Sequence, residues 1–145
     1  MYQKIILAYD GSLESQQAIL NCKDLPQWEQ AKVHLLSVVP YDSIAMGHET
    51  SYYSEQNIKL EEGRALKILN EGVEQLHKMG IDAKGELLKG DAVDRIVEYA
   101  YEQSADLIML GHKHRDNWLE RWWCGSVPKA LIEHSPCSVL IVIIK

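Results

Sequence analysis

The pattern of hydrophobic and polar residues divides this chain into strand-like and helix-like segments. Short, almost continuous apolar runs are typical of strands buried on both faces of a sheet, and they cover residues 4–10, 33–39, 105–111 and 138–144. A fifth run, residues 81–89, alternates more between polar and apolar positions and predicts an edge strand. Apolar residues spaced three or four apart predict amphipathic helices between these runs, over residues 13–25, 55–79, 93–101 and 126–134.

The order of these elements predicts the fold class. Strands and helices alternate along the chain, and the helical connections are long enough for parallel crossovers. We therefore expect one α/β domain over residues 1–145, a doubly wound five-stranded parallel sheet with helices on both faces, Rossmann-like in architecture. Such sheets bind ligands beyond the carboxyl ends of their strands, where the strand order reverses. Residues 40–54 have no clear period and are expected to form a loop.

Polar and glycine residues mark the expected ends of several elements. Asp10-Gly11-Ser12 predicts a turn after the first strand, and Ser12 is placed to cap the helix that follows. Gly80 is placed to terminate the long helix, and Gly90-Asp91 predicts a turn into the next one.

Composition and charge limit the classes of protein to which this chain can belong. Hydrophobic residues make up 46% of the chain and charged residues 25%, as in an ordinary globular protein. Twenty-one acidic and fifteen basic residues give a net charge of −6, which argues against binding nucleic acid or an anionic membrane. No apolar stretch is long enough to span a membrane. Three cysteines cannot all pair, and no targeting segment is recognisable, so we expect a cytoplasmic protein.

The residues best suited to bind a ligand lie between the fourth predicted strand and the last predicted helix. Gly111 gives the backbone room to turn sharply near a ligand, and Gly125-Ser126 stands where a helix begins, a ready site for a phosphate. The residues from His112 to Arg115 add positive charge that suits a polyphosphate. The alternative is structural: a glycine ending a strand, a serine capping a helix and a solvated loop. His112 and His114 have no cysteine nearby, so we assign no metal site.

Several segments resemble the universal stress protein (UspA) family. They are the opening strand and turn at 5–12, the turn at 90–96, the strand at 105–111, the glycine-containing segment 111–126 and the closing segment 135–142. The resemblance covers almost the whole chain in order. It implies the fold of adenine-nucleotide α-hydrolase-like proteins, a role in stress response or signalling, and ATP or another adenine nucleotide as ligand, with Mg²⁺ as a candidate companion.

The resemblance also implies roles for individual residues. Asp10 would face the ribose and a metal ion, while Ala8, Tyr9 and Val38 would line the adenine slot. The ribose and phosphates would be held by Gly111, Gly125, Ser126 and Val127. His112 and His114, whose positive charge suits a polyphosphate, complete the predicted nucleotide-binding set. From the residues alone, Asp10 is equally well explained as a turn residue that satisfies its own backbone, and Val38 as plain core.

The chain departs from the family motif at one place. His114 stands where nucleotide-binding members have their second glycine, and ten residues rather than nine precede Gly125. The alternative function is therefore a dimer that binds no nucleotide and serves as a protein interaction module. Its contact surface would be formed by Trp118, Trp122 and Trp123, unless these side chains pack onto their own domain.

Other functions are less consistent with the sequence. No paired carboxylates or Ser-His-Asp set indicate a hydrolytic centre, so we assign no catalytic residue and expect at most slow ATP hydrolysis or autophosphorylation. A phospho-acceptor receiver domain needs an aspartate at the end of its third strand, where residues 87–89 read Leu-Leu-Lys.

The apolar strand 138–144 lies at the end of the chain, and the family resemblance implies that it pairs across a two-fold axis in a homodimer.

Overall fold

The computed structural model describes residues 2–23, 30–39, 55–113 and 126–144. Five strands form its sheet: β1 (Lys4–Ala8), β2 (Lys32–Val39), β3 (Asp82–Lys89), β4 (Leu107–Lys113) and β5 (Ser138–Ile144). The helices are α1 (Leu13–Cys22), α3 (Glu55–Lys78), α4 (Ala92–Glu102) and α6 (Ser126–His134). The predictions for residues 40–54 and for the three tryptophans at 118, 122 and 123 lie outside the described residues.

The sheet is parallel throughout, with the order β3-β2-β1-β4-β5. The chain builds β1, β2 and β3 toward one edge and then crosses back to add β4 and β5 at the other. The strand order therefore reverses between β1 and β4, which is where such folds form their ligand sites. This arrangement confirms the predicted α/β class and the position of β3 at an edge.

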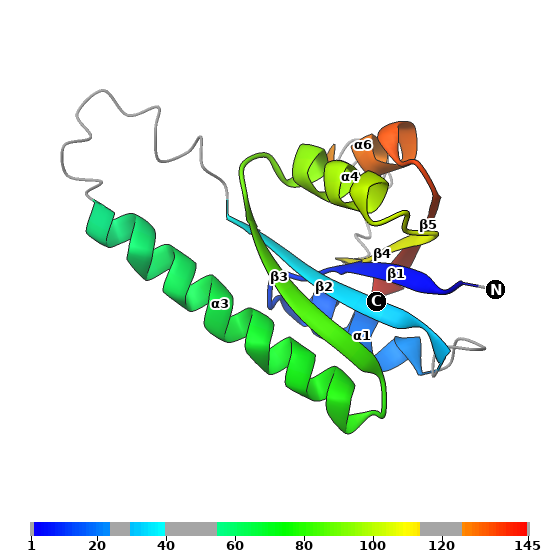
Figure 1. Cartoon of the computed structure of the whole chain (residues 1–145), viewed down its shortest axis with the longest axis horizontal. Helices are drawn as coiled ribbons and strands as arrows, with labels where there is room; N and C mark the ends of the chain where they lie inside the picture. Colours follow the sequence, from blue (N-terminus) through cyan, green and yellow to red (C-terminus); the bar gives the residue numbers. More distant parts are fainter. Residues whose placement is uncertain (1, 24–29, 40–54, 114–125, 145) are drawn as a thin grey trace.

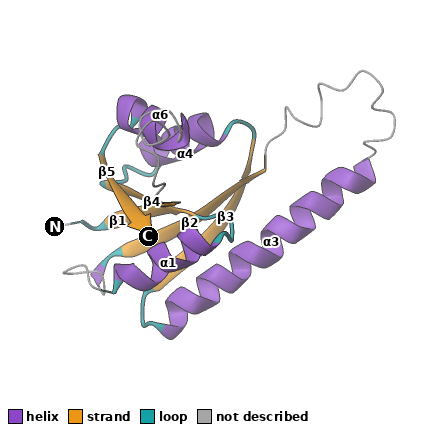
Figure 2. Cartoon of the chain, turned by 180° about the vertical axis from the view of Figure 1, so that it is seen from behind, coloured by secondary structure: helices purple, strands orange, loops and turns teal. Residues whose placement is uncertain are grey.

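Helices cover both faces of the sheet, α1 and α3 on one and α4 and α6 on the other (Figures 1 and 2). Adjacent side chains of a strand point to opposite faces, so Leu7 belongs to the core under α1 and α3, and Ile6 to the core under α4 and α6. Both side chains are almost completely buried. Burial on both faces explains why the central strands read as continuous apolar runs.

The predicted caps are present. The Ser15 backbone N–H donates to the Ser12 hydroxyl at the start of α1. At the end of α3, the N–H of Gly80 donates to the His77 carbonyl and that of Ile81 to the Leu76 carbonyl, the paired bonds of a Schellman motif.

Several predicted boundaries are wrong: β1 ends at Ala8 rather than at residue 10, and β4 begins at Leu107 rather than at residue 105. Two further differences have a clear physical reason. Helix α1 ends at Cys22, three residues before the predicted end at position 25, because an apolar stripe marks the face of a helix and not its last turn. Strand β4 continues through Lys113, two residues beyond the predicted end at Gly111. There His112 lies in register with Ile143 and Lys113 with Ile144. Pairing with β5 therefore keeps these two residues in the strand, although their polarity predicts a loop.

Candidate functional site

A cavity of about 380 Å³ lies at the carboxyl ends of β1, β2 and β4. It is lined by Ala8, Tyr9, Asp10, Ser12, Ser15, Leu36, Val38, Ala92, Ile96, Leu110, Gly111, His112, Val127 and Pro128. Three helices contribute their first turns to this wall: α1 through Ser12 and Ser15, α4 through Ala92, and α6 through Val127 and Pro128. Unpaired N–H groups and the positive end of the helix dipole at such turns favour an anionic ligand.

Seven of the ten predicted site residues lie on this wall: Ala8, Tyr9, Asp10, Val38, Gly111, His112 and Val127. His114 and Gly125 lie outside the described residues. Ser126 begins α6, as predicted. The fold therefore brings together predicted residues from β1, β2, β4 and α6.

The cavity floor is apolar, and Tyr9 contributes to it differently from its neighbours. Ala8 and Val38 pack with the core on the side of α4 and α6. The Tyr9 ring belongs to the opposite core and lies over Gly72 of α3, where an added Cβ would come within 2.8 Å of it. The Ser37 hydroxyl donates to the Tyr9 carbonyl over 2.6 Å and fixes the backbone at the end of β1.

Asp10 is both a turn residue and a cavity residue. Its Oδ1 accepts a hydrogen bond from the Ser12 backbone N–H at 2.9 Å, which confirms the structural interpretation of this side chain. Burial alone would raise the pKa of the Asp10 carboxyl, but hydrogen bonds from the Ser12 hydroxyl and N–H and from Ser15 lower it below 3.8. The cavity thus holds an ionised carboxylate at neutral pH.

Two serines beside Asp10 are site residues that the sequence argument missed. The Ser15 hydroxyl donates to the Ser12 carbonyl over 2.9 Å, and the two hydroxyls lie 3.3 Å apart. Ser12 was expected only as a helix cap. The signal that could have found them is their spacing, since residues three apart in a first turn share one side of the helix.

Gly111 lines the cavity, but it does not form the predicted sharp turn. It lies within β4, opposite Val142. A Cβ at this position would collide with the carbonyl group of Glu14 and lie 3.2 Å from the Ala18 Cβ. The absence of a side chain therefore lets α1 pack closely on β4, and this packing accounts for the glycine.

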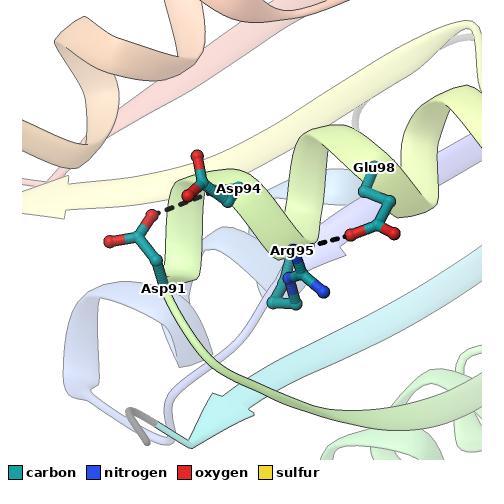
Figure 3. A network of polar contacts seen from close by, with 4 residues as sticks. All are labelled: Asp91, Asp94, Arg95 and Glu98. Atoms are coloured by element: carbon teal, nitrogen blue, oxygen red, sulfur yellow. Dashed lines mark hydrogen bonds and ion pairs between the residues drawn. The ribbon is translucent and has the colours of Figure 1, made fainter. Parts of the chain in front are cut away.

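The first turn of α4 is held in place by polar contacts away from the cavity (Figure 3). Asp91 caps the helix, because its Oδ1 accepts the Asp94 backbone N–H at 3.0 Å. Arg95 and Glu98 form an exposed ion pair of 2.8 Å one turn further on. These contacts orient the helix whose Ala92 and Ile96 form the apolar wall, two further residues that the sequence argument assigned no site role.

Within the part of the chain that the structure describes, no three histidine, cysteine, aspartate or glutamate residues cluster as metal ligands. Among the same residues, no helix is long and apolar enough to cross a membrane.

Comparison with known proteins establishes the family. The model of the universal stress protein family matches residues 1–142, and the chain belongs to this family. A universal stress protein of Methanocaldococcus jannaschii is 31% identical over 144 residues, which cover 98% of this chain and 82% of the relative.

Solved structures share the fold. UspA of Lactobacillus plantarum matches with a TM-score of 0.78 and 24% identity, covering 97% of each chain. An Arabidopsis thaliana family member with AMP bound matches with a TM-score of 0.68 and 17% identity, covering 99% of this chain and 92% of its own. Other structures with this fold are universal stress proteins in complex with cAMP and, from Archaeoglobus fulgidus, with dAMP.

Proposed function

We propose that this protein binds an adenine nucleotide in the cavity at the carboxyl ends of β1, β2 and β4, and acts in stress response or signalling through its bound state. One observation carries the proposal: seven residues predicted for such a site, from four separate strands and helices, line a single cavity of about 380 Å³. That volume is within the range of small-molecule sites. The AMP, dAMP and cAMP complexes of proteins with this fold support the choice of ligand.

The cavity offers chemistry for each part of such a ligand. Its apolar wall, with Ala8, Val38 and Ile96, suits the adenine ring. The ionised Asp10 carboxylate suits the ribose hydroxyls as a hydrogen-bond acceptor. The first turn of α6 and His112 suit the phosphates.

Mg²⁺ is compatible with this site when a nucleotide supplies most of the ligands. The Asp10 carboxylate and the serine hydroxyls beside it are hard oxygen donors. The ion would contribute neutralisation of phosphate charge. With a single carboxylate on the described wall, we propose binding rather than fast hydrolysis, with slow hydrolysis or autophosphorylation as the limit.

We also propose a homodimer formed through β5. This strand is an edge of the sheet, every residue from Val139 to Ile144 is apolar, and Ile143 is 50% exposed. An apolar edge of this kind is a template for pairing with another chain. The spacing of the three cysteines indicates no disulfide framework, and we place the protein in the cytoplasm as part of the same proposal.

The nucleotide proposal is tested first by acid extraction of the purified protein, identification of any released nucleotide and calorimetric titration of the stripped protein with ATP. Val127→Trp, which fills the cavity from α6, should raise the dissociation constant at least about tenfold. Ile132→Trp is the matched control, because Ile132 is 62% exposed on the same helix and does not line the cavity. Thermal melts of both variants check that they fold.

The alternative is an interaction module that binds no nucleotide, which the departure at His114 and the lengthened segment favour. No extracted nucleotide and no heat of binding at millimolar ATP would contradict the nucleotide proposal. The surface at Trp118, Trp122 and Trp123 would then be the place to seek a protein partner.

The dimer is tested by Ile143→Asp, which places a charge on the apolar edge. Sedimentation velocity should show a dimer for the native chain and for the control Ile132→Asp, and a monomer for Ile143→Asp. A dimer that persists in Ile143→Asp means that the subunits meet elsewhere.

A further inference from the structure

A second cavity, of about 360 Å³, lies at the opposite ends of the strands, where β1, β2 and β3 begin. Its wall is formed by Lys4, Lys32, Val33, His34, Asp82, Lys84 and Gln103. The length of β1, five residues or about 13 Å, separates it from the first cavity. None of the residues considered for nucleotide binding contributes to it.

The strand register explains why charged residues gather here. Lys4 lies opposite Lys32, Lys32 opposite Asp82, and His34 opposite Lys84. Side chains two residues apart on a strand, and partners across a parallel pair, point to the same face. These residues therefore share the face that carries α4, beyond the part of it that the helix covers.

Lysines predominate on the wall of this cavity. Three lysines and one aspartate line it, in a protein whose net charge is −6. Two further carboxylates lie beside it, since Glu86 acts on His34 and Asp106 accepts the Lys4 backbone N–H at 3.0 Å. Within the described ranges, neither Lys32 nor Lys84 forms an ion pair within 4.0 Å. Lys4 Nζ donates to the Gln103 carbonyl at 3.1 Å, just beyond the end of α4. Like charges directly opposite on neighbouring strands are destabilising, and an anion between them would relieve that repulsion.

His34 supplies a further donor at the inner wall. It is 8% exposed, and its Nδ1 lies 2.9 Å from the Tyr99 hydroxyl. Burial, then Glu86 and Glu102, raise the pKa of Tyr99, so the phenol stays protonated and can donate to Nδ1. The proton of the neutral imidazole then sits on Nε2, for which the described residues show no hydrogen-bond partner.

We propose that this second cavity binds a small multivalent phosphate anion. Three ammonium groups on adjacent strands present mobile point charges that suit phosphate oxygens. Val33 is the one apolar residue on the described wall, so this cavity, unlike the first, offers little apolar surface for a base. The lysines are exposed to solvent, so the binding is reversible and weakens with salt. The anion is either free inorganic polyphosphate or the phosphate chain of a nucleotide.

The test uses inorganic tripolyphosphate and the native chain, followed by NMR of the His34 ring protons across a pH titration. Burial, then Lys84, Lys4 and Lys32, hold the pKa of His34 below 6.5, with Glu86 opposing them. Tripolyphosphate in the cavity should raise that pKa and shift the His34 resonances with saturation. Unchanged resonances at millimolar tripolyphosphate would overturn the proposal without any variant.

Calorimetry then compares two double variants with the same change in net charge. Lys32→Glu/Lys84→Glu should raise the dissociation constant at least about tenfold, and Lys59→Glu/Lys67→Glu, on the exposed face of α3, should leave it nearly unchanged. Equal weakening in both would show attraction to the whole protein and overturn the site. Lys32→Gln/Lys84→Gln repeats the comparison if the charge reversals do not fold.

ATP separates the two sources of phosphate. In Val127→Trp, whose first cavity is filled, ATP that still shifts the His34 resonances as tripolyphosphate does would identify the nucleotide phosphate chain as an occupant. A shift with tripolyphosphate alone would identify the free anion. Either result stands even if the first cavity binds no nucleotide.

Discussion

The two cavities lie at opposite ends of the strands of one parallel sheet, and their walls differ in chemistry. The ends where the strands finish form the carboxyl edge, and the ends where they begin form the amino edge. At the carboxyl edge, first turns of α1, α4 and α6 surround an apolar floor and one ionised carboxylate, Asp10. At the amino edge, lysines predominate, and Lys4 bonds a carbonyl just beyond the end of α4. Parallel crossovers direct every helix N-terminus to one edge and every C-terminus to the other. Backbone N–H groups can hold an anion at the first edge, whereas side-chain cations must do so at the second.

The largest expected effect distinguishes packing from ligand binding at the carboxyl edge. Gly111→Ala should lower the free energy of unfolding by about 3 kcal/mol, because the new Cβ meets the backbone carbonyl of Glu14. Gly63→Ala, which has open space around it on α3, should instead raise it by up to about 1 kcal/mol. Urea unfolding without ligand measures both. Native stability in Gly111→Ala together with weaker nucleotide binding would assign this glycine to the ligand and not to α1.

The next effect concerns the amino edge. Tyr99→Phe should lower the free energy of unfolding by about 1–2 kcal/mol, because it leaves Nδ1 of the buried His34 without its hydrogen bond. Tyr101→Phe, on the exposed side of the same helix, is the control. Equal stability of the two variants in urea would mean that the His34–Tyr99 contact contributes nothing to the fold.

A smaller effect is expected on the pH dependence of the free energy of unfolding, to which the two edges contribute in different pH ranges. His34 binds its proton more weakly when folded, so the free energy of unfolding falls as the pH drops below 6.5, down to the folded pKa. Asp10 has a lowered pKa, so its contribution is present above pH 3.8 and is lost as the pH falls through the folded value. Urea titrations over pH should show that His34→Gln removes the first loss and Asp10→Asn the second. If both variants kept the native pH profile, neither group would be perturbed by its cavity.

The smallest effect lies at the end of α4, beside the second cavity. Ser104 has a φ of 52°, and the N–H of Ala105 bonds the Ala100 carbonyl there. Glycine is favoured at such a position, so Ser104→Gly should raise the melting temperature, with a gain of about 0.5 kcal/mol in the free energy of unfolding. Ser135→Gly has no positive φ to relieve and should not stabilise. A lower melting temperature for Ser104→Gly would mean that its side chain holds the end of α4.

The comparison of the two edges also shows where sequence reasoning worked. The carboxyl-edge residues were recognised because turns, caps and a family motif mark the ends of strands, as at Asp10 and Val127. The amino-edge lysines carry no such mark, because Lys32 and Lys84 look like ordinary polar residues at the beginnings of strands. Their proximity depends on the order and register of three strands that are far apart in the sequence. Ser15 differs from the lysines, because its spacing from Ser12 is a local signal that places both residues in the first turn of α1.

The sequence by itself determined the α/β class, the alternation of strands and helices, the polar edge strand β3 and the caps at Ser12 and Gly80. All of these depend on local periodicity and on neighbours a few residues apart. Only the tertiary structure decided that β4 extends to Lys113, that Gly111 makes room for α1, and that lysines of three strands line one cavity. Each of these follows from a non-local partner: a strand that completes a hydrogen-bonded ladder, a helix that approaches a missing Cβ, or a register that aligns like charges.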